Sequence, residues 1–177
     1  MLFRSDRVLC HLVLDGRVTG GAGYTQWFWL VAAVKNLVLV PHLQGKLHLP
    51  SAREMMARAV PRDDIRAAVG AGVQVSAQPA QNPTAARRAA GNAFRSRGDQ
   101  RRLTLIVAEP YAAAAAKIAE ALSDAARVTV EVVPAADPAA EASNRIAAGQ
   151  PVDGILTDDA GTQAVTALPG FPEAYPL

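Results

Sequence analysis

Residues 103–157, LTLIVAEPYAAAAAKIAEALSDAARVTVEVVPAADPAAEASNRIAAGQPVDGILT, decide the fold. Three short apolar runs in this stretch have the length of buried strands: residues 103–108, 128–133 and 152–157. The alanine-rich segments between them predict helices over residues 111–122 and 139–148. Alternating strands and helices indicate a parallel sheet with helices on its faces. We therefore predict an α/β protein of three layers, in which helices cover both faces of a mainly parallel sheet.

The chain before this stretch predicts further elements of both kinds. Apolar runs predict strands over residues 8–14, 37–40 and 73–75, and periodic segments predict helices over residues 24–35, 51–60, 62–69 and 84–97. Ser51, with Glu54 three residues later, has the spacing of a capping box. A short helix is also expected over residues 162–168. Trp27 and Trp29 flank Phe28 and cannot share one helix face, so we expect one indole to be largely buried and the other partly exposed.

The 177 residues suit one domain or two very small ones. Residues 78–83 contain two prolines and are the best linker, which predicts an N-terminal α/β segment of residues 1–80 and a C-terminal α/β unit of residues 84–177. The pattern leaves open whether the two form one sheet or two. The abrupt start at Met1 and the loop-like residues 171–177 lead us to expect a fragment, truncated or artefactual at its start.

Composition excludes several classes of protein. The chain is 50% hydrophobic and 19% charged, which is typical of a globular protein and not of a disordered one. No apolar run reaches the roughly 18 residues that a membrane span needs. The single cysteine, Cys10, excludes an internal disulfide framework and a multi-thiolate metal site. No nucleophile–base signature is present, so binding is favoured over catalysis.

Charge is divided unevenly along the chain. Up to Arg101 there are 14 basic and 6 acidic residues, and from Arg102 onward there are 4 basic and 10 acidic residues. The densest basic stretch predicts a weak, salt-sensitive contact with a polyanion through six arginines: Arg87, Arg88, Arg95, Arg97, Arg101 and Arg102. Phe94 is the only aromatic residue among them, so base stacking is poorly supplied. The alternative is an ordinary solvated face.

Acidic side chains follow all three strands of the deciding stretch. In open α/β sheets, ligands bind beyond the carboxyl ends of the strands. The candidate ligand-binding residues there are Glu109, Pro110, Tyr111, Asp137, Asp158 and Asp159. Carboxylates this close favour a cationic, amine-bearing or polyol solute, or a divalent cation, over an oxyanion. We expect Glu109, Asp137 and Asp158 to converge in one crevice. Helix capping by Asp137 and Asp159 is the alternative.

Residues 103–168 resemble the opening of type II periplasmic solute-binding proteins, the molybdate-binding kind most closely. The matching pieces are LTLIVAEPYAAAAAKIAEAL, VTVEVVPAAD and RIAAGQPVDGILTDD. The resemblance implies a lobe that binds a small solute. Glu109-Pro110-Tyr111 replaces the small hydroxyl-bearing turn of that family, and the acidic edge opposes an oxyanion, so the ligand stays open. No signal peptide is visible, which makes the cytoplasm the default location; the resemblance, with a truncated start, implies the periplasm.

A second class of function fits the same acidic edge. Glu109 at the end of one strand and Asp158-Asp159 at the end of a later one could hold Mg²⁺ for phosphoryl transfer. The layout resembles the Toprim nucleotidyl-transfer domain, although the acidic pair is adjacent here and spaced by one residue there. The alternative prediction is therefore a cytosolic α/β domain that binds a nucleotide or Mg²⁺.

Overall fold

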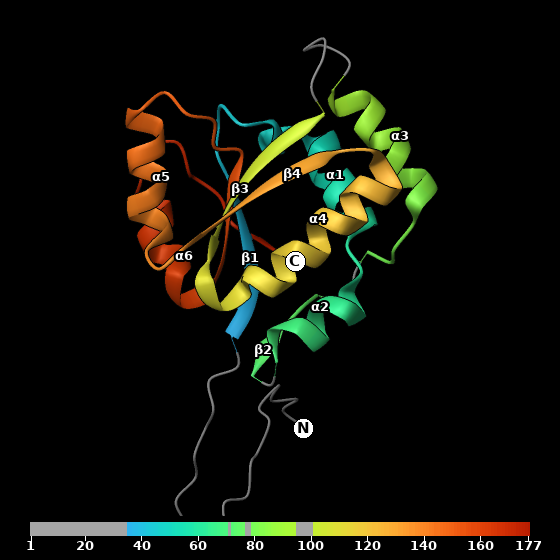
Figure 1. Cartoon of the computed structure of the whole chain (residues 1–177), viewed down its shortest axis with the longest axis horizontal. Coiled ribbons are helices and arrows are strands. Elements are labelled where there is room, and N and C mark those ends of the chain that lie inside the picture. The colour runs from blue at the N-terminus through green and yellow to red at the C-terminus, as the bar shows by residue number, and fades with distance from the viewer. Residues whose placement is uncertain (1–34, 71, 77–78, 95–100) are drawn as a thin grey trace, which may run out of the picture. The chain divides into compact units, whose positions relative to one another are not determined.

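A computed structural model describes residues 35–70, 72–76, 79–94 and 101–177 (Figure 1). The strand predicted over residues 8–14, nearly all of the helix predicted over residues 24–35 with Trp27 and Trp29, and the side chains of Arg95 and Arg97 lie outside these residues. Residues Lys35–Leu177 form one compact unit.

The described residues contain one mixed sheet of six strands. The strands are β1 Lys35–Pro41, β2 Val73–Gln74, β3 Arg102–Ala108, β4 Thr129–Ala135, β5 Gly154–Asp158 and β6 Tyr175–Pro176. Their order is β2-β1-β5-β3-β4, with β6 also beside β1. Strands β5, β3 and β4 run parallel, as predicted, whereas β1 runs antiparallel to β5.

The N-terminal and C-terminal parts of the described chain share this sheet. Strand β1 pairs with β5 over its last five residues, from Leu37 opposite Asp158 to Pro41 opposite Gly154. The described residues from both parts of the chain therefore form one sheet and not two. The division of the chain at residues 78–83 stays a prediction.

Helices cover both faces of the sheet, which confirms the predicted three layers. They are α1 Pro50–Ala59, α2 Arg62–Val69, α3 Pro83–Ala93, α4 Ala112–Ala126, α5 Pro138–Ala147 and α6 Asp159–Thr166, with short 3-10 turns η1 Lys46–His48 and η2 Glu109–Tyr111. Helices α1, α2 and α3 pack with α4, while α5 and α6 pack on the strands and on each other. Figure 1 shows α5 and α6 on one side of the sheet and α1, α3 and α4 on the other.

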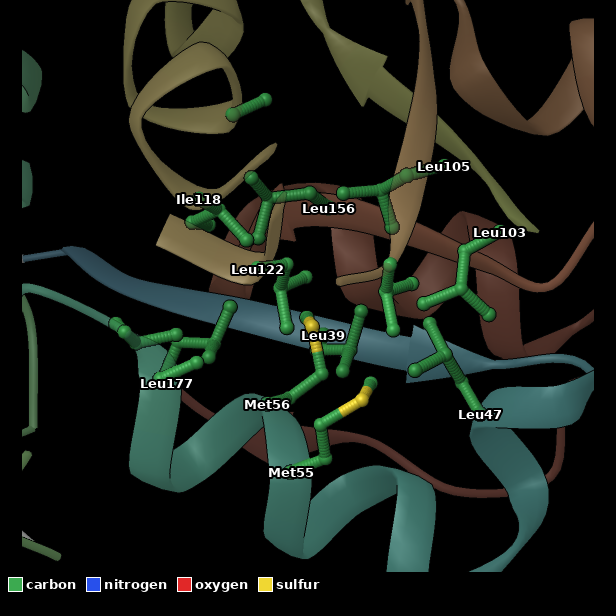
Figure 2. Close-up of a cluster of buried hydrophobic side chains, with 14 of the residues drawn as sticks. Leu39, Leu47, Met55, Met56, Leu103, Leu105, Ile118, Leu122, Leu156 and Leu177 are labelled. Atoms are coloured by element: carbon green, nitrogen blue, oxygen red, sulfur yellow. The ribbon is translucent and has the colours of Figure 1, made fainter. Parts of the chain in front are cut away.

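The side chains of the central strands alternate between two cores. Leu37 and Leu39 of β1 belong to the larger cluster, and Val38 and Val40 belong to the smaller one. This period of two is what a pleated strand with both faces covered requires. Figure 2 shows the larger cluster, where Met55 and Met56 of α1 and Ile118 and Leu122 of α4 meet Leu39, Leu105 and Leu156 of the sheet. The C-terminal Leu177 is buried in the same cluster.

The starts of α1 and α3 are among those that differ from their predicted positions. The prediction of a capping box at Ser51 and Glu54 is wrong. Helix α1 begins at Pro50, and its N-cap, Leu49, makes no side-chain cap hydrogen bond. Proline suits the first helical position, where its missing N–H costs nothing, and it places Ser51 inside the helix. Helix α3 begins one residue earlier than predicted, at Pro83, and the Asn82 side chain accepts a hydrogen bond from the Ala85 N–H at 3.0 Å.

These caps predict a difference between two alanine substitutions. Asn82→Ala should lower the free energy of unfolding by about 1 kcal/mol, because it removes a used cap. Ser51→Ala should change the same free energy by less than about 0.5 kcal/mol, as for an ordinary surface change. Urea unfolding followed by circular dichroism measures both. Equal losses in the two variants would contradict the helix starts described here.

Candidate functional site

The sheet register brings the ends of three parallel strands to one edge. Val107 of β3 lies opposite Leu156 of β5 and Pro134 of β4. Neighbouring strands lie about 4.8 Å apart. Glu109 comes directly after β3, Asp158 is the last residue of β5, and Asp137 lies two residues after β4. The backbone positions therefore share the edge that the strand order predicts, and convergence of the three side chains in one crevice stays a prediction.

Asp158 is the most heavily bonded of the candidate residues. It is buried at the end of β5, and its Oδ1 accepts the Gly161 N–H at 2.9 Å as the N-cap of α6. Its Oδ2 accepts the Tyr111 hydroxyl at 2.7 Å and lies 2.9 Å from the Lys35 ammonium. The carboxylate thus joins the starts of β1 and α6 to the turn after β3.

Hydrogen bonding outweighs burial in setting the charge of Asp158. Burial by itself would raise the pKa of this carboxyl, but hydrogen bonds from Tyr111, Lys35 and the Gly161 N–H stabilise the anion and lower the pKa to about 2. Burial and the hydrogen bond to Asp158 raise the pKa of the Tyr111 phenol. At neutral pH the pair is therefore an ionised carboxylate and a neutral phenol.

Asp159 has a different role from the predicted cap. Helix α6 takes Asp158 as its N-cap and Asp159 as its first residue, so it begins three residues before the predicted helix of residues 162–168. The exposed Asp159 Oδ2 accepts the Asn36 N–H at 3.0 Å and the Asn36 side-chain amide at 2.7 Å. A cavity of about 300 Å³ lies beside it, lined by Asn36, Val38, Asp159, Thr162, Ala174 and Pro176.

The other candidates differ in their access to solvent. Glu109 and Pro110 are exposed in η2. Asp137 is exposed and caps α5 by accepting the Ala140 N–H at 3.0 Å, as the capping alternative predicted. Tyr111 is 5% exposed and packs in the larger core, and its hydroxyl donates a hydrogen bond to Asp158. Glu109, Asp137 and Asp159 are the exposed candidate carboxylates, which a solute can reach.

Lys35 and Asn36 are the site residues that the sequence did not reveal. They contact Asp158 and Asp159 only because β1 lies antiparallel beside β5. Both open a strand that was predicted from its apolar residues alone, and nothing in that pattern shows which strand it will pair with. The Lys35 side chain is 51% exposed, so its ammonium covers Asp158 on the solvent side.

No group of three or more histidine, cysteine, aspartate or glutamate side chains in the described part of the chain is arranged to hold a metal ion. None of its helices is long and apolar enough to cross a bilayer.

Comparisons identify the fold. The chain matches no protein-family model and no curated protein. Its structure is similar to the ABC transporter substrate-binding protein CtaP of Listeria monocytogenes, with a TM-score of 0.55, 14% identity, and coverage of 71% of this chain and 30% of that one. The Escherichia coli murein tripeptide binding protein MppA is similar with a TM-score of 0.53 and 15% identity, over 71% of this chain and 29% of that one. Listeria monocytogenes OppA bound to peptide is similar with a TM-score of 0.54 and 9% identity, over 72% of this chain and 31% of that one.

At these identities the similarity shows the fold. The described residues have a type II solute-binding-like α/β fold. The chain spans less than a third of the length of these three proteins. The type II solute-binding fold predicted from residues 103–168 is thus confirmed. The similarity of this region to the molybdate-binding kind is not supported by these three neighbours.

Proposed function

We propose that this chain is a small-solute-binding lobe that holds its ligand at the carboxyl edge of β3 and β5, and that the ligand carries an ammonium or another cationic group. The observation that carries the proposal is the ion pair between Asp158 and Lys35. A buried carboxylate, backed by the Tyr111 hydroxyl, already holds an ammonium at this edge. The ammonium of a ligand can take the same position when the exposed lysine swings away.

The surroundings of this pair favour the same ligand class. Glu109 and Asp159 are exposed carboxylates at the same edge, and they attract cations and repel oxyanions. The cavity of about 300 Å³ beside Asp159 combines the polar Asn36 and Thr162 with apolar Val38 and Pro176. Its volume lies at the small end of the range for ligand pockets, which suits a small polar solute.

The structural neighbours support a peptide-like solute. One is a murein tripeptide binding protein and another is an OppA bound to peptide. A short peptide carries a free ammonium at neutral pH. The chain spans less than a third of the length of these neighbours. We therefore propose solute binding for this lobe and not the activity of a whole transport protein.

Isothermal titration calorimetry on the full chain tests the proposal. The panel contains dipeptides, tripeptides, simple amines, sugars, oxyanions and Mg²⁺. We expect heats with the amines or peptides, and about tenfold weaker affinity in Asp159→Asn and in Glu109→Gln, since one charge-assisted contact is worth about 1.5 kcal/mol. Glu54→Gln, an exposed change on α1, is the matched control and should leave the affinity unchanged.

Two results would decide against an amine ligand. Molybdate, sulfate or phosphate binding that survives Glu109→Gln unchanged would refute the charge argument. A Mg²⁺ heat that Asp159→Asn abolishes, with no heat from any amine or peptide, would favour the alternative nucleotide- or Mg²⁺-binding domain.

A further inference from the structure

The edge of the sheet opposite Glu109 and Asp159 is basic. Arg101 and Arg102 lie at the start of β3, and Arg127 lies two residues before β4; all three are exposed. Lys46 of η1 reaches the same place, with its Nζ donating to the Arg102 carbonyl oxygen at 2.6 Å. In Figure 1 the start of β3 and the end of α5 both lie toward the top of the view, whereas α4 starts lower down. We call this surface the amino edge.

The arginines of the amino edge have local contacts but keep most of their donors. Arg101 Nη1 donates to the Ala126 carbonyl oxygen at 3.2 Å, and Arg87 Nε donates to that of Ala125 at 3.3 Å. Both carbonyls belong to the last turn of α4, where a cation is favoured by the helix dipole. Each guanidinium has five N–H donors. The ion pairs found in the described residues use Lys35, Arg66, Lys117 and Arg145, so the positive charge of Arg101, Arg102 and Arg127 faces outward uncompensated.

Two large apolar side chains are exposed at the same edge. Leu43, in the turn after β1, is 46% exposed, and Ile146, in the last turn of α5, is 39% exposed. They are the large hydrophobic residues that the described chain leaves exposed. Ile146 lines a cavity of about 300 Å³ whose other walls include His42, Lys46 and Gln150. Apolar and basic side chains therefore occupy one surface around Lys46.

Few carboxylates of the described residues lie on this surface. Asp153 is buried and accepts two backbone N–H groups. Glu131 is paired with Arg145 at 3.1 Å. Among the described residues, the exposed Asp124 near the end of α4 lies three positions before Arg127. The amino edge is therefore strongly positive relative to the carboxyl edge.

We infer that the amino edge docks on a bilayer surface that contains anionic phospholipids. Such a surface offers phosphate charges to Arg101, Arg102 and Arg127, and an apolar layer beneath them to Leu43 and Ile146. A nucleic acid also offers phosphates, but its bases stack on aromatic rings and it has no apolar layer for exposed aliphatic side chains. The aromatic ring described at this edge, Phe94, is partly buried and lies 5.7 Å from the Lys46 ammonium.

The orientation of the lobe follows from this contact. With the amino edge against the bilayer, the carboxyl edge with Glu109 and Asp159 faces away from it. The acidic edge is then also kept away from the anionic headgroups, which would repel it. The bilayer contact does not depend on the proposed solute site and is tested separately from it.

Vesicle co-sedimentation of the full chain tests the inference. The probes are vesicles of phosphatidylcholine alone and of phosphatidylcholine mixed equally with phosphatidylglycerol, at low and at physiological salt. We expect binding to the anionic vesicles only. Arg102→Gln with Arg127→Gln should weaken it about 25-fold, at about fivefold per arginine. Leu43→Ser should weaken it further at physiological salt, where the electrostatic attraction is screened.

A matched control removes the same charge elsewhere. Lys117→Gln with Arg66→Gln changes two exposed cations on α4 and α2, away from the amino edge, and should leave vesicle binding unchanged. Circular dichroism checks that each variant is folded. Absence of binding to anionic vesicles at low salt would overturn the inference, and so would equal weakening by both charge pairs. Binding to duplex DNA or heparin, unaffected by Leu43→Ser and without vesicle binding, would show a polyanion surface instead.

Discussion

Replacing Asp153 by alanine is expected to lower the free energy of unfolding by about 4 kcal/mol. Asp153 is 5% exposed, and its two oxygens accept the Lys46 N–H at 2.7 Å and the Thr104 N–H at 2.8 Å. Alanine leaves both backbone donors without this acceptor, and a buried donor left unsatisfied costs about 1–3 kcal/mol. The start of η1 and strand β3 then lose the carboxylate that bridges their backbones. Urea unfolding at neutral pH measures the loss.

The asparagine variant and a surface variant make this prediction specific. Asp153→Asn keeps one oxygen acceptor, so we expect about half of the loss. Asp124→Ala removes an exposed carboxylate from α4 and should change the free energy of unfolding by less than about 0.5 kcal/mol. An alanine variant at position 153 as stable as the parent would show that the carboxylate does not hold these strands together.

Asp158→Ala is expected to lower the free energy of unfolding by about 3 kcal/mol at neutral pH. It removes the N-cap of α6, worth about 1 kcal/mol. It also leaves the buried Tyr111 hydroxyl without its acceptor, which costs about 1–3 kcal/mol. Asp137→Ala is the control, because it removes only a cap at the same edge and should cost about 1 kcal/mol.

The effect of Asp158→Ala should depend on pH. The pKa of Asp158 is lowered from 3.8 to about 2 in the folded protein, so its stabilising contribution is present above about pH 4 and is lost as the pH falls through about 2. The difference in unfolding free energy between the parent and Asp158→Ala should therefore shrink from pH 4 to pH 2. Urea unfolding across this range measures it. A difference that stays constant would mean that the folded protein does not hold the ionised carboxylate.

Tyr111→Phe separates the hydrogen bond from the helix cap. The ring stays in the core, while the donor to Asp158 is lost, so the pKa of Asp158 should rise toward its ordinary value. We expect the acid-dependent loss of stability to be smaller in Tyr111→Phe than in the parent and to be complete at a higher pH, because the folded and unfolded pKa values of Asp158 then lie closer together. An unchanged loss would assign the low pKa of Asp158 to Lys35 and Gly161 alone.

The sequence by itself determined the parts of the fold that local pattern encodes. The apolar runs at residues 103–108, 128–133 and 152–157 became β3, β4 and β5, because short runs of β-branched and aliphatic residues favour strands. The alanine-rich segments between them became α4 and α5. The right order of elements also placed Glu109, Asp137 and Asp158 after strands that end at one edge of the sheet.

Only the tertiary structure decided which distant segments meet. Strand β1 could pair with any open edge, and its antiparallel place beside β5 brought Lys35 to Asp158 and Asn36 to Asp159. The same packing turned Asp153 into the acceptor that joins η1 to β3. These contacts join residues about 50 to 120 positions apart, as the burial of two cores around one sheet requires. The local spacing of residues does not predict these contacts, because the side chains involved are typical of turns and strand ends anywhere in a protein.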